Sequence, residues 1–423
     1  GAGTVYEYDK LGREVAQIDP AGNRVSHEYD ALGNMITTAT PLGITRHEYD
    51  AAGRLVSSVT PLGEQTRYQY DLTGNLTWTQ DPEGNETHFG YDALGRKTGI
   101  LDATQQAAVY DYDENSNLTA VTDPENNTTV FRYDSLNRKI KTIRPMGQQT
   151  VFEYDPAGNL DSIVTPEGHK TAYAYDTLNQ PKQVSYFNRS NLSAPVKTVL
   201  FSYDGNGNMT GYDDAVTSAV YTYDGLDRNL STTVDFGPFS KTFANAWPDN
   251  WTRTFTGPDN QTTTFAYDAA QRLISAAHPS AGRMSCSDYL WHLPQSKSIP
   301  GADLENSYDL NGRKTAITSN TGFNREYLYS PNGNMEMRDT EHGTYTYSHD
   351  ELSRLTGVTA PAGLDNESYT YDAVGNRLTS LSDTGWQYNA NNEMTNRSGS
   401  TCSHDANGNM ISRSGPDPMT FVY

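Results

Sequence analysis

Aspartate is the residue of this sequence best suited to chemistry, because it recurs directly after tyrosine at a nearly constant spacing. An aspartate can act as a general acid or base, as a nucleophile or as a metal ligand. Within residues 1–181 a regular series of Tyr-Asp pairs begins at nine positions, and seven of the eight intervals between them are 21 residues and one is 20. A catalytic group does not need nine copies, so we expect this aspartate to cap a turn. The nine tyrosines are Tyr8, Tyr29, Tyr49, Tyr70, Tyr91, Tyr112, Tyr133, Tyr154 and Tyr175.

Two segments resemble the opening of a calcium-binding loop, in which side-chain oxygens alternate along the chain. These are Asp111-x-Asp113-x-Asn115 and Asp204-x-Asn206-x-Asn208. The twelfth position of such a loop should be glutamate, but it is Thr122 in the first segment and Ala215 in the second. Hairpin turns explain the same residues better.

Other kinds of reactive site have no motif here. His27 and His47 lie in equivalent slots of adjacent repeats, about 9.6 Å apart, whereas zinc needs each nitrogen within about 2.1 Å. Nucleophilic triads and phosphate-binding glycine loops are absent as motifs. A hydrolase with paired carboxylates among the 52 acidic residues stays as a third alternative, although no spacing singles out a pair. We therefore expect no catalytic residue, no metal and no cofactor.

Three tryptophans are the candidate ligand contacts, because an exposed indole can stack on a sugar. They are Trp247, Trp251 and Trp291, in the part of the chain where the repeat is least regular. Packing is the alternative role, since tryptophan is mostly buried.

Charge and composition exclude several classes of partner. The chain has 31 Lys and Arg against 52 Asp and Glu, a formal charge of −21, which argues against nucleic acid as a partner. Its length of 423 residues suggests two or three domains, but only 35% of residues are hydrophobic, so a thick core cannot form. The 29 Tyr, 12 Phe and 5 Trp argue against disorder. No stretch suits membrane insertion, and a bridge between Cys286 and Cys402 stays open.

The repeat predicts one β-hairpin per unit. Each unit reads aromatic-x-Tyr-Asp-x-x-Gly-(Asn/Arg)-Leu, followed by a second turn of the form Asp-Pro-x-Gly. Two turns in about 21 residues leave two strands of six or seven residues. The two aromatic slots share a face. We expect Leu55, Ser57 and Val59, and likewise Leu160, Ser162 and Val164, to lie on that same face and fill the space between the tyrosine strands.

The repeat continues less regularly beyond residue 181. Its tyrosines are Tyr203, Tyr223, Tyr267, Tyr308, Tyr329 and Tyr371, and some intervals are doubled. We expect Trp291-His292, His349-Asp350, Tyr388-Asn389 and His404-Asp405 to fill the missing slots. Regular repeats cover 1–181, degenerate repeats with a candidate loop or plug cover 182–300, and shorter repeats resume over 301–423. Phe421 to Tyr423 would begin a further unit, so we expect this chain to be part of a longer protein.

About twenty hairpins give on the order of forty strands, or roughly 190 Å of sheet at about 4.8 Å per strand. An open twisted sheet of that width must curl. The predicted fold is therefore all-β: antiparallel hairpin repeats in one continuous sheet, wound into a spiral or hollow shell, over a single array from 1 to 423.

The chain resembles the RHS (rearrangement hot-spot) or YD-repeat family. The resemblance rests on Tyr49-Asp-Ala-Ala-Gly-Arg-Leu55, Tyr91-Asp-Ala-Leu-Gly-Arg96 and Tyr371-Asp-Ala-Val-Gly-Asn-Arg-Leu378, and it extends over essentially the whole chain. Members include bacterial polymorphic toxins, the C components of insecticidal toxin complexes and the teneurins. The resemblance implies a secreted, exported or cell-surface protein whose repeats enclose or present a C-terminal effector.

Two functions follow from this resemblance. The first is a non-catalytic shell that encloses an effector belonging to the parent chain and absent from this sequence. The second is an adhesion module that binds glycans or surface proteins. Nothing here resembles the self-cleaving segment that follows the repeats in family toxins, so autoproteolysis cannot be assigned to any residue.

Overall fold

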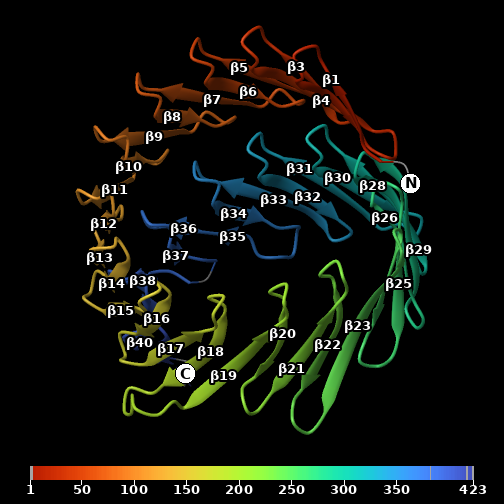
Figure 1. The fold of residues 1–423 in the computed structure, drawn as a ribbon. Helices are drawn as coiled ribbons and strands as arrows, with labels where there is room; N and C mark the ends of the chain where they lie inside the picture. Colours follow the sequence, from red (N-terminus) through yellow and green to blue (C-terminus); the bar gives the residue numbers. More distant parts are fainter. Residues whose placement is uncertain (1–2, 382, 416–417, 422–423) are drawn as a thin grey trace. The chain divides into compact units, whose positions relative to one another are not determined.

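The computed structural model describes residues 3–381, 383–415 and 418–421, and the regular elements among them are all β-strands. Strands β1 to β35 form one sheet, β36 and β37 form a two-stranded sheet, and β38 to β42 form a five-stranded sheet. Figure 1 shows the strands following one another as hairpins. The expected all-β array of antiparallel hairpins is confirmed. Val422 and Tyr423, part of the expected further unit, lie outside the described residues.

The chain divides into two compact units, and each contains segments far apart in sequence. The first unit comprises 1–95, 100–105 and 246–368, and the second comprises 96–99, 106–245 and 369–423. Strands β10 (Lys97–Leu101) and β23 (Ser240–Asp249) have residues in both units.

The strands of the first unit are β1 (Val5–Tyr8), β2 (Glu14–Ile18), β3 (Arg24–Tyr29), β4 (Met35–Thr40), β5 (Gly43–Tyr49), β6 (Leu55–Val59), β7 (Gln65–Tyr70), β8 (Leu76–Gln80), β9 (Glu86–Tyr91), β24 (Thr252–Thr256), β25 (Thr262–Tyr267), β26 (Leu273–His278), β27 (Gly282–Leu290), β28 (Leu293–Ile299), β29 (Ala302–Tyr308), β30 (Lys314–Ser319), β31 (Asn324–Tyr329), β32 (Met335–Thr340), β33 (Gly343–His349), β34 (Leu355–Thr359) and β35 (Glu367–Ser368).

The strands of the second unit are β11 (Ala107–Tyr112), β12 (Leu118–Thr122), β13 (Thr128–Tyr133), β14 (Lys139–Ile143), β15 (Gln149–Tyr154), β16 (Leu160–Val164), β17 (Lys170–Tyr175), β18 (Pro181–Phe187), β19 (Lys197–Tyr203), β20 (Met209–Asp213), β21 (Ser218–Tyr223), β22 (Asn229–Asp235), β36 (Thr370–Tyr371), β37 (Arg377–Thr379), β38 (Gln387–Tyr388), β39 (Met394–Arg397), β40 (Ser400–His404), β41 (Met410–Arg413) and β42 (Met419–Thr420).

Each Tyr-Asp hairpin closes on a tight turn that needs one residue with positive φ. In the hairpin of β5 and β6, the Asp50 N–H donates to the Arg54 carbonyl at 2.9 Å, and the Gly53 N–H donates to the Asp50 carbonyl at 3.0 Å. Gly53 has a φ of +76°, which glycine adopts without steric cost. The pairing register shifts between Glu48 and Tyr49, so the tyrosine sits at a β-bulge next to the turn.

This bulge overturns the expectation that Leu160, Ser162 and Val164 share the aromatic face. Tyr154 lies opposite Leu160, but across the register shift Glu153 lies opposite Ser162. Residues opposite each other in an antiparallel pair point to the same face, so Ser162 and Val164 lie on the Glu153 face. The buried Ser162 hydroxyl donates to the Glu153 carboxylate at 2.7 Å. The triplet Leu55, Ser57 and Val59 is divided in the same way.

Burial is shallow along the array, as a sheet of single thickness requires. The buried hydrophobic residues among those described are Ala16, Leu42, Val184, Ala219, Tyr369 and Cys402. Most other strand residues are half-buried. The side-chain contacts and hydrogen bonds between neighbouring hairpins must therefore supply much of the stability.

Residues 182–300 form strands β18 to β28 of the 35-stranded sheet. Within them, the expectation that Trp291-His292 fills a Tyr-Asp slot is wrong. Leu290 pairs with Leu293, so Trp291 and His292 form a two-residue turn, and Trp291 has a φ of +57°. By contrast, His349, Tyr388 and His404 each occupy the bulge position of their hairpins, as expected. Cys286 and Cys402 are free thiols.

Candidate functional site: the Tyr-Asp turn and the contacts between turns

The repeated aspartate is fully engaged by its own turn. Asp50 Oδ1 accepts the N–H groups of Ala52 at 2.9 Å and Arg54 at 3.0 Å, and Oδ2 accepts Arg54 Nε at 2.7 Å. Where asparagine replaces the arginine, as at Asn75, its amide donates to Oδ2 of Asp71 at 2.8 Å. Such bonds stabilise the ionised carboxylate and make it a poor base.

The pKa values of these carboxyls follow from the same contacts. The side-chain hydrogen bond from Arg54 lowers the pKa of Asp50. Hydrogen bonds from Thr73 and Asn75 lower the pKa of Asp71 to about 2. A carboxyl held in this way stays charged at neutral pH and acts as a structural acceptor.

The two segments that resembled calcium loops form ordinary turns of this kind. Asp113 Oδ1 accepts the N–H groups of Asn115 and Asn117, and Asp204 Oδ1 accepts those of Asn206 and Asn208. Among the described residues, no three His, Cys, Asp or Glu side chains are grouped so that they could hold a metal ion. His27, one of the two histidines considered for zinc, contacts the Thr38 hydroxyl at 3.2 Å. Burial lowers the pKa of the second, His47.

The tyrosine hydroxyls join each hairpin to the one before it. In eleven of the fifteen predicted tyrosines, the hydroxyl donates to a backbone carbonyl at the start of the preceding hairpin's second strand, at 2.7 to 2.9 Å. For example, Tyr154 donates to Lys139 and Tyr175 donates to Leu160. The eleven are Tyr29, Tyr49, Tyr70, Tyr112, Tyr133, Tyr154, Tyr175, Tyr203, Tyr223, Tyr308 and Tyr329.

The other four predicted tyrosines lie at the same place in their hairpins. Tyr8, Tyr267 and Tyr371 sit at register shifts, and Tyr91 ends β9. The sequence analysis missed one further member, Tyr289, whose hydroxyl donates to the Leu273 carbonyl. It is followed by leucine and not by aspartate, so only its distance of 22 residues from Tyr267 could have revealed it.

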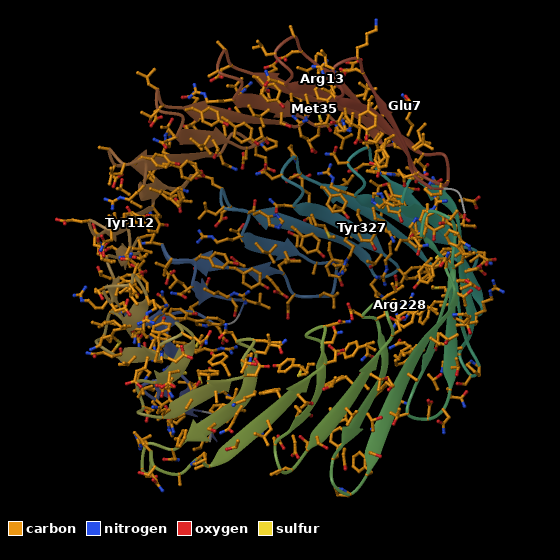
Figure 2. All side chains as sticks on the ribbon, in the orientation of Figure 1. Glu7, Arg13, Met35, Tyr112, Arg228 and Tyr327 are labelled. Atoms are coloured by element: carbon orange, nitrogen blue, oxygen red, sulfur yellow. The ribbon has the colours of Figure 1, made fainter. Side chains whose placement is uncertain are left out.

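Arginines at the ends of the turns reinforce this ladder. Arg13, labelled in Figure 2, pairs with Asp9, its guanidinium lies 4.6 Å from the ring centroid of Tyr29, and its Nη1 donates to the Asp30 carbonyl at 3.3 Å. Arg54 repeats the arrangement with Asp50, the Tyr70 ring and the Asp71 carbonyl. Each such arginine therefore bridges its own turn and the next one.

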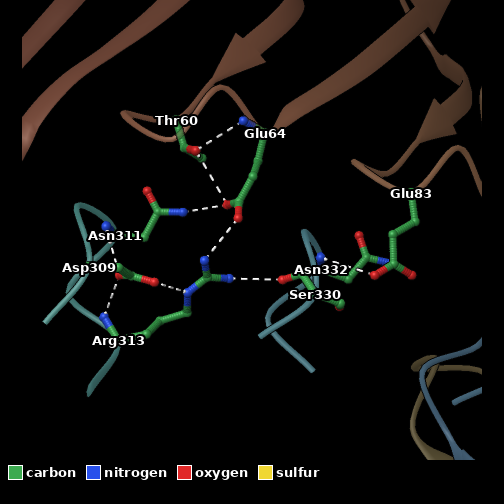
Figure 3. Close-up of polar contacts among 8 residues, drawn as sticks. All are labelled: Thr60, Glu64, Glu83, Asp309, Asn311, Arg313, Ser330 and Asn332. Carbon is green, nitrogen blue, oxygen red and sulfur yellow. Dashed lines mark hydrogen bonds and ion pairs between the residues drawn. The ribbon is translucent and has the colours of Figure 1, made fainter. Parts of the chain in front are cut away.

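A second set of contacts joins turns far apart in sequence within the first unit. Glu64, in a Pro-x-Gly turn, accepts Arg313 Nη2 at 3.0 Å and also accepts the Asn311 amide (Figure 3). Arg313 in turn pairs with Asp309 at 2.6 Å and donates to the Ser330 carbonyl at 3.0 Å. The side chains of Glu64 and Arg313 are 13% and 20% exposed, so this ion pair is largely shielded from water.

The neighbouring pair of turns makes an equivalent contact. Asn332 Nδ2 donates to Asp81 Oδ2 at 2.6 Å and to Glu83 Oε2 at 3.1 Å. In Figure 3, Glu83 and Glu64 come from adjacent turns of one segment, and Asn332 and Asn311 come from turns of the other.

The second unit contains the same type of contact. Arg144 pairs with Glu393, and Asn391 donates to Gln148 Oε1 at 3.0 Å. Glu167 Oε1 accepts the Ala406 N–H at 2.7 Å. In both units a Pro-x-Gly turn meets a Tyr-Asp-type turn 239 to 251 residues later. The sequence analysis predicted neither these pairs nor their spacing.

The three candidate tryptophans occupy different settings. Trp247 lies in β23 and lines a cavity of about 240 Å³. Trp251 lies two residues after Asp249, and its N–H donates to Asp249 Oδ1 at 2.7 Å. Trp291 lies in the two-residue turn described above, where its ring contacts that of His292 edge to face at 4.5 Å.

Fold and turns together define a class of protein: an array of hairpin repeats held by a tyrosine ladder and by turn-to-turn contacts. Comparison with known proteins identifies this class further. The family model described as "Teneurin YD-shell" matches residues 3–199 and 333–423. The chain therefore belongs to the teneurin YD-shell family, and the expected resemblance is confirmed. No curated protein matches the sequence.

Solved structures show the same fold. A TcdB2-TccC3 complex without its hypervariable C-terminal region matches with a TM-score of 0.79 and 15% identity, over 98% of this chain and 29% of that chain. A TcdB2-TccC3-Cdc42 complex matches with 0.78 and 15% identity, over 97% and 28%. The Photorhabdus luminescens Tc holotoxin pore, with a substituted TccC3, matches with 0.76 and 15% identity, also over 97% and 28%. This chain thus spans less than a third of those chains and shares their shell fold.

Proposed function

We propose that this chain is a structural shell segment that encloses a C-terminal effector of its parent protein. The observation that carries the proposal is the pair of bonding systems: the tyrosine ladder joins successive hairpins, and the turn-to-turn contacts join distant ones. A protease or an unfolded cargo would enter or leave at sheet edges and at gaps between hairpins. The tyrosine ladder and the turn-to-turn contacts both close such gaps.

Membership of a shell family and the match to Tc toxin components support this role. One matched complex is described as lacking a hypervariable C-terminal region. Secretion or export, with the effector as the main partner, is part of the proposal. No helix among the residues that the structure describes could span a membrane.

The proposed role is not enzymatic. The aspartates best suited to catalysis accept two or more hydrogen bonds within their own turns, and the tyrosine hydroxyls are donors to backbone carbonyls. The repeated polar groups are thus committed to holding the sheet together.

Protease protection tests the proposal. A protease-sensitive reporter domain is fused to the C-terminus of the chain and digested beside the same reporter mixed with the unfused chain. We expect the fused reporter to survive longer, because enclosure requires attachment during folding. Equal digestion rates would contradict the shell role.

A further inference from the structure

We propose that a groove on one face of strands β19 to β22 binds an extended peptide segment of a partner protein. In this segment an aliphatic residue is followed two residues later by lysine or arginine. The inference goes beyond the proposed shell, because the groove lies within the second unit and requires no enclosed cargo. The four strands lie side by side in Figure 1. The groove consists of two cavities, of about 400 and 250 Å³, which share Asp213 and Ser218 as lining residues.

The strand pairing places the lining side chains in two adjacent rows on one face of the sheet. Residues opposite each other in an antiparallel pair point to the same face, so each row crosses the strands from one to the next. The two rows are two residues apart along a strand, or about 6.8 Å. The first row is Ser202, Gly211 and Val220, and the second is Leu200, Asp213, Ser218 and Asp235.

The first row forms the apolar part of the groove. Gly211 has no side chain, which leaves a recess next to Val220, and the Val220 side chain is 57% exposed. Leu200, diagonal to Gly211 across the strand pair, is 50% exposed. A larger residue could not fill the recess, because a Cβ on Gly211 would lie 2.7 Å from the Ala219 carbonyl oxygen. Exposed aliphatic groups beside a recess are typical of a surface that binds another apolar group.

The second row forms the acidic part of the groove. Asp213 and Asp235 lie two strands apart, about 9.6 Å between backbones, with Ser218 between them. One oxygen of each carboxylate accepts a backbone N–H of its own turn at 2.8 Å. Among the described residues, neither carboxylate pairs with a basic side chain, whereas the neighbouring Asp214 pairs with Lys197 at 2.7 Å. Two carboxylates without a cation of their own favour a basic group on the ligand.

The distance between the rows favours an extended peptide as the ligand. In an extended chain, side chains at i and i+2 point to the same side and lie about 6.8 Å apart, which equals the separation of the rows. An aliphatic side chain at i can therefore lie over Gly211 while lysine or arginine at i+2 reaches Asp213 and Asp235. A small amine would leave the apolar part of the groove empty, and the two carboxylates would repel an anion.

The experiment titrates the full chain by calorimetry with three short peptides, each acetylated and amidated at its ends. The first, Gly-Thr-Leu-Thr-Lys-Thr-Gly, has leucine and lysine two residues apart, and the second has glutamate in place of the lysine. The third, Gly-Thr-Thr-Leu-Lys-Thr-Gly, has the same composition as the first, but its adjacent leucine and lysine point to opposite sides of an extended chain. The first should bind with a Kd of about 1 mM or lower, and the other two about tenfold more weakly or not at all.

Substitutions of the two aspartates locate the binding site. Asp213→Asn and Asp235→Asn each remove a charge, while the amide oxygen can still accept the N–H of the turn. Each should weaken binding of the first peptide about threefold or more, and the double variant about tenfold or more. Glu114→Gln is the matched control, because it removes one charge from an exposed residue outside the groove. It should leave binding within about twofold.

The proposal would be overturned if the first peptide does not bind, or if either of the other two binds as tightly. It would also be overturned if the aspartate variants bind like the unmodified chain or like Glu114→Gln. Sedimentation of the chain alone tests a different occupant: a dimer that the two aspartate substitutions abolish would place a second copy in the groove and contradict the peptide assignment. Protease protection of a passenger depends on neither carboxylate, so failure here is distinct from failure of the shell.

Discussion

Replacing Arg313 by glutamine isolates the contact between distant turns, because Arg54 provides a matched control. Both arginines pair with the aspartate of their own turn and donate to the carbonyl of the next, at 3.0 Å for Arg313 and 2.7 Å for Arg54. Both lie over the next tyrosine ring, at 5.3 and 4.9 Å. Only the Arg313 contacts include a carboxylate from a distant turn, that of Glu64.

The expected difference follows from the burial of that ion pair. A hydrogen bond between charged groups contributes about 1.5 to 3 kcal/mol, and an exposed surface pair about 0 to 1 kcal/mol. The Glu64 and Arg313 side chains are 13% and 20% exposed, which places the contact between these limits. We therefore expect Arg313→Gln to cost about 1 to 2 kcal/mol more than Arg54→Gln. Combined with Glu64→Gln in a double-mutant cycle, it should give a coupling energy of about the same size.

Native-state hydrogen exchange measures the difference in local stability between the two variants. It does not require that the whole array unfolds in one step. The reporters are the Gly63 and Gly312 amides, each of which donates within its own turn. Both should exchange about 5 to 30 times faster in Arg313→Gln than in Arg54→Gln. Equal exchange in the two variants, or a coupling energy below about 0.5 kcal/mol, would refute the reasoning.

Three further tests, which use five substitutions, concern the repeat itself. Tyr154→Phe removes one ladder hydrogen bond and should cost about 0.5 to 1.5 kcal/mol in denaturant unfolding, whereas Tyr8→Phe, in the exposed first strand, should cost nearly nothing. Because contacts lower the Asp71 pKa from 3.8 to about 2, the stability it contributes is present above pH 3.8 and lost as the pH falls towards 2. Asp71→Asn should therefore flatten the low-pH part of a plot of unfolding free energy against pH. An unchanged plot would contradict the role of Asp71 as the cap of its turn. Gly43→Ala should lower the melting temperature more than Gly63→Ala, since its Cβ would lie 2.7 Å from a proline, while nothing lies within 4 Å of the other.

The hairpins were predictable because the turn chemistry is local. An aspartate that caps two N–H groups and a glycine with positive φ fix the reversal within five residues, whatever the rest of the chain does. The face assignment failed for an equally local reason. The bulge at each tyrosine adds one residue to the second strand, and strict alternation from the proline therefore assigns Ser162 to the wrong face.

The contacts between distant turns could not be predicted from the repeat. Which turn lies against Glu64 depends on the twist and curvature that accumulate over many hairpins. A small difference in twist at each strand therefore changes which turn it contacts. Trp291 illustrates a different limit. A large aromatic followed by histidine matches the repeat in sequence, but Tyr289 takes the ladder position two residues earlier, so Trp291 falls in the turn.

Electron cryo-microscopy at a resolution that separates strands tests the central claim most directly. The account predicts consecutive hairpins spaced at about 4.8 Å per strand. It also predicts that, within the first unit, the Glu64 turn lies against the Arg313 turn, 249 residues later. A map in which these two turns are apart, or in which successive hairpins do not join into one sheet, would contradict it.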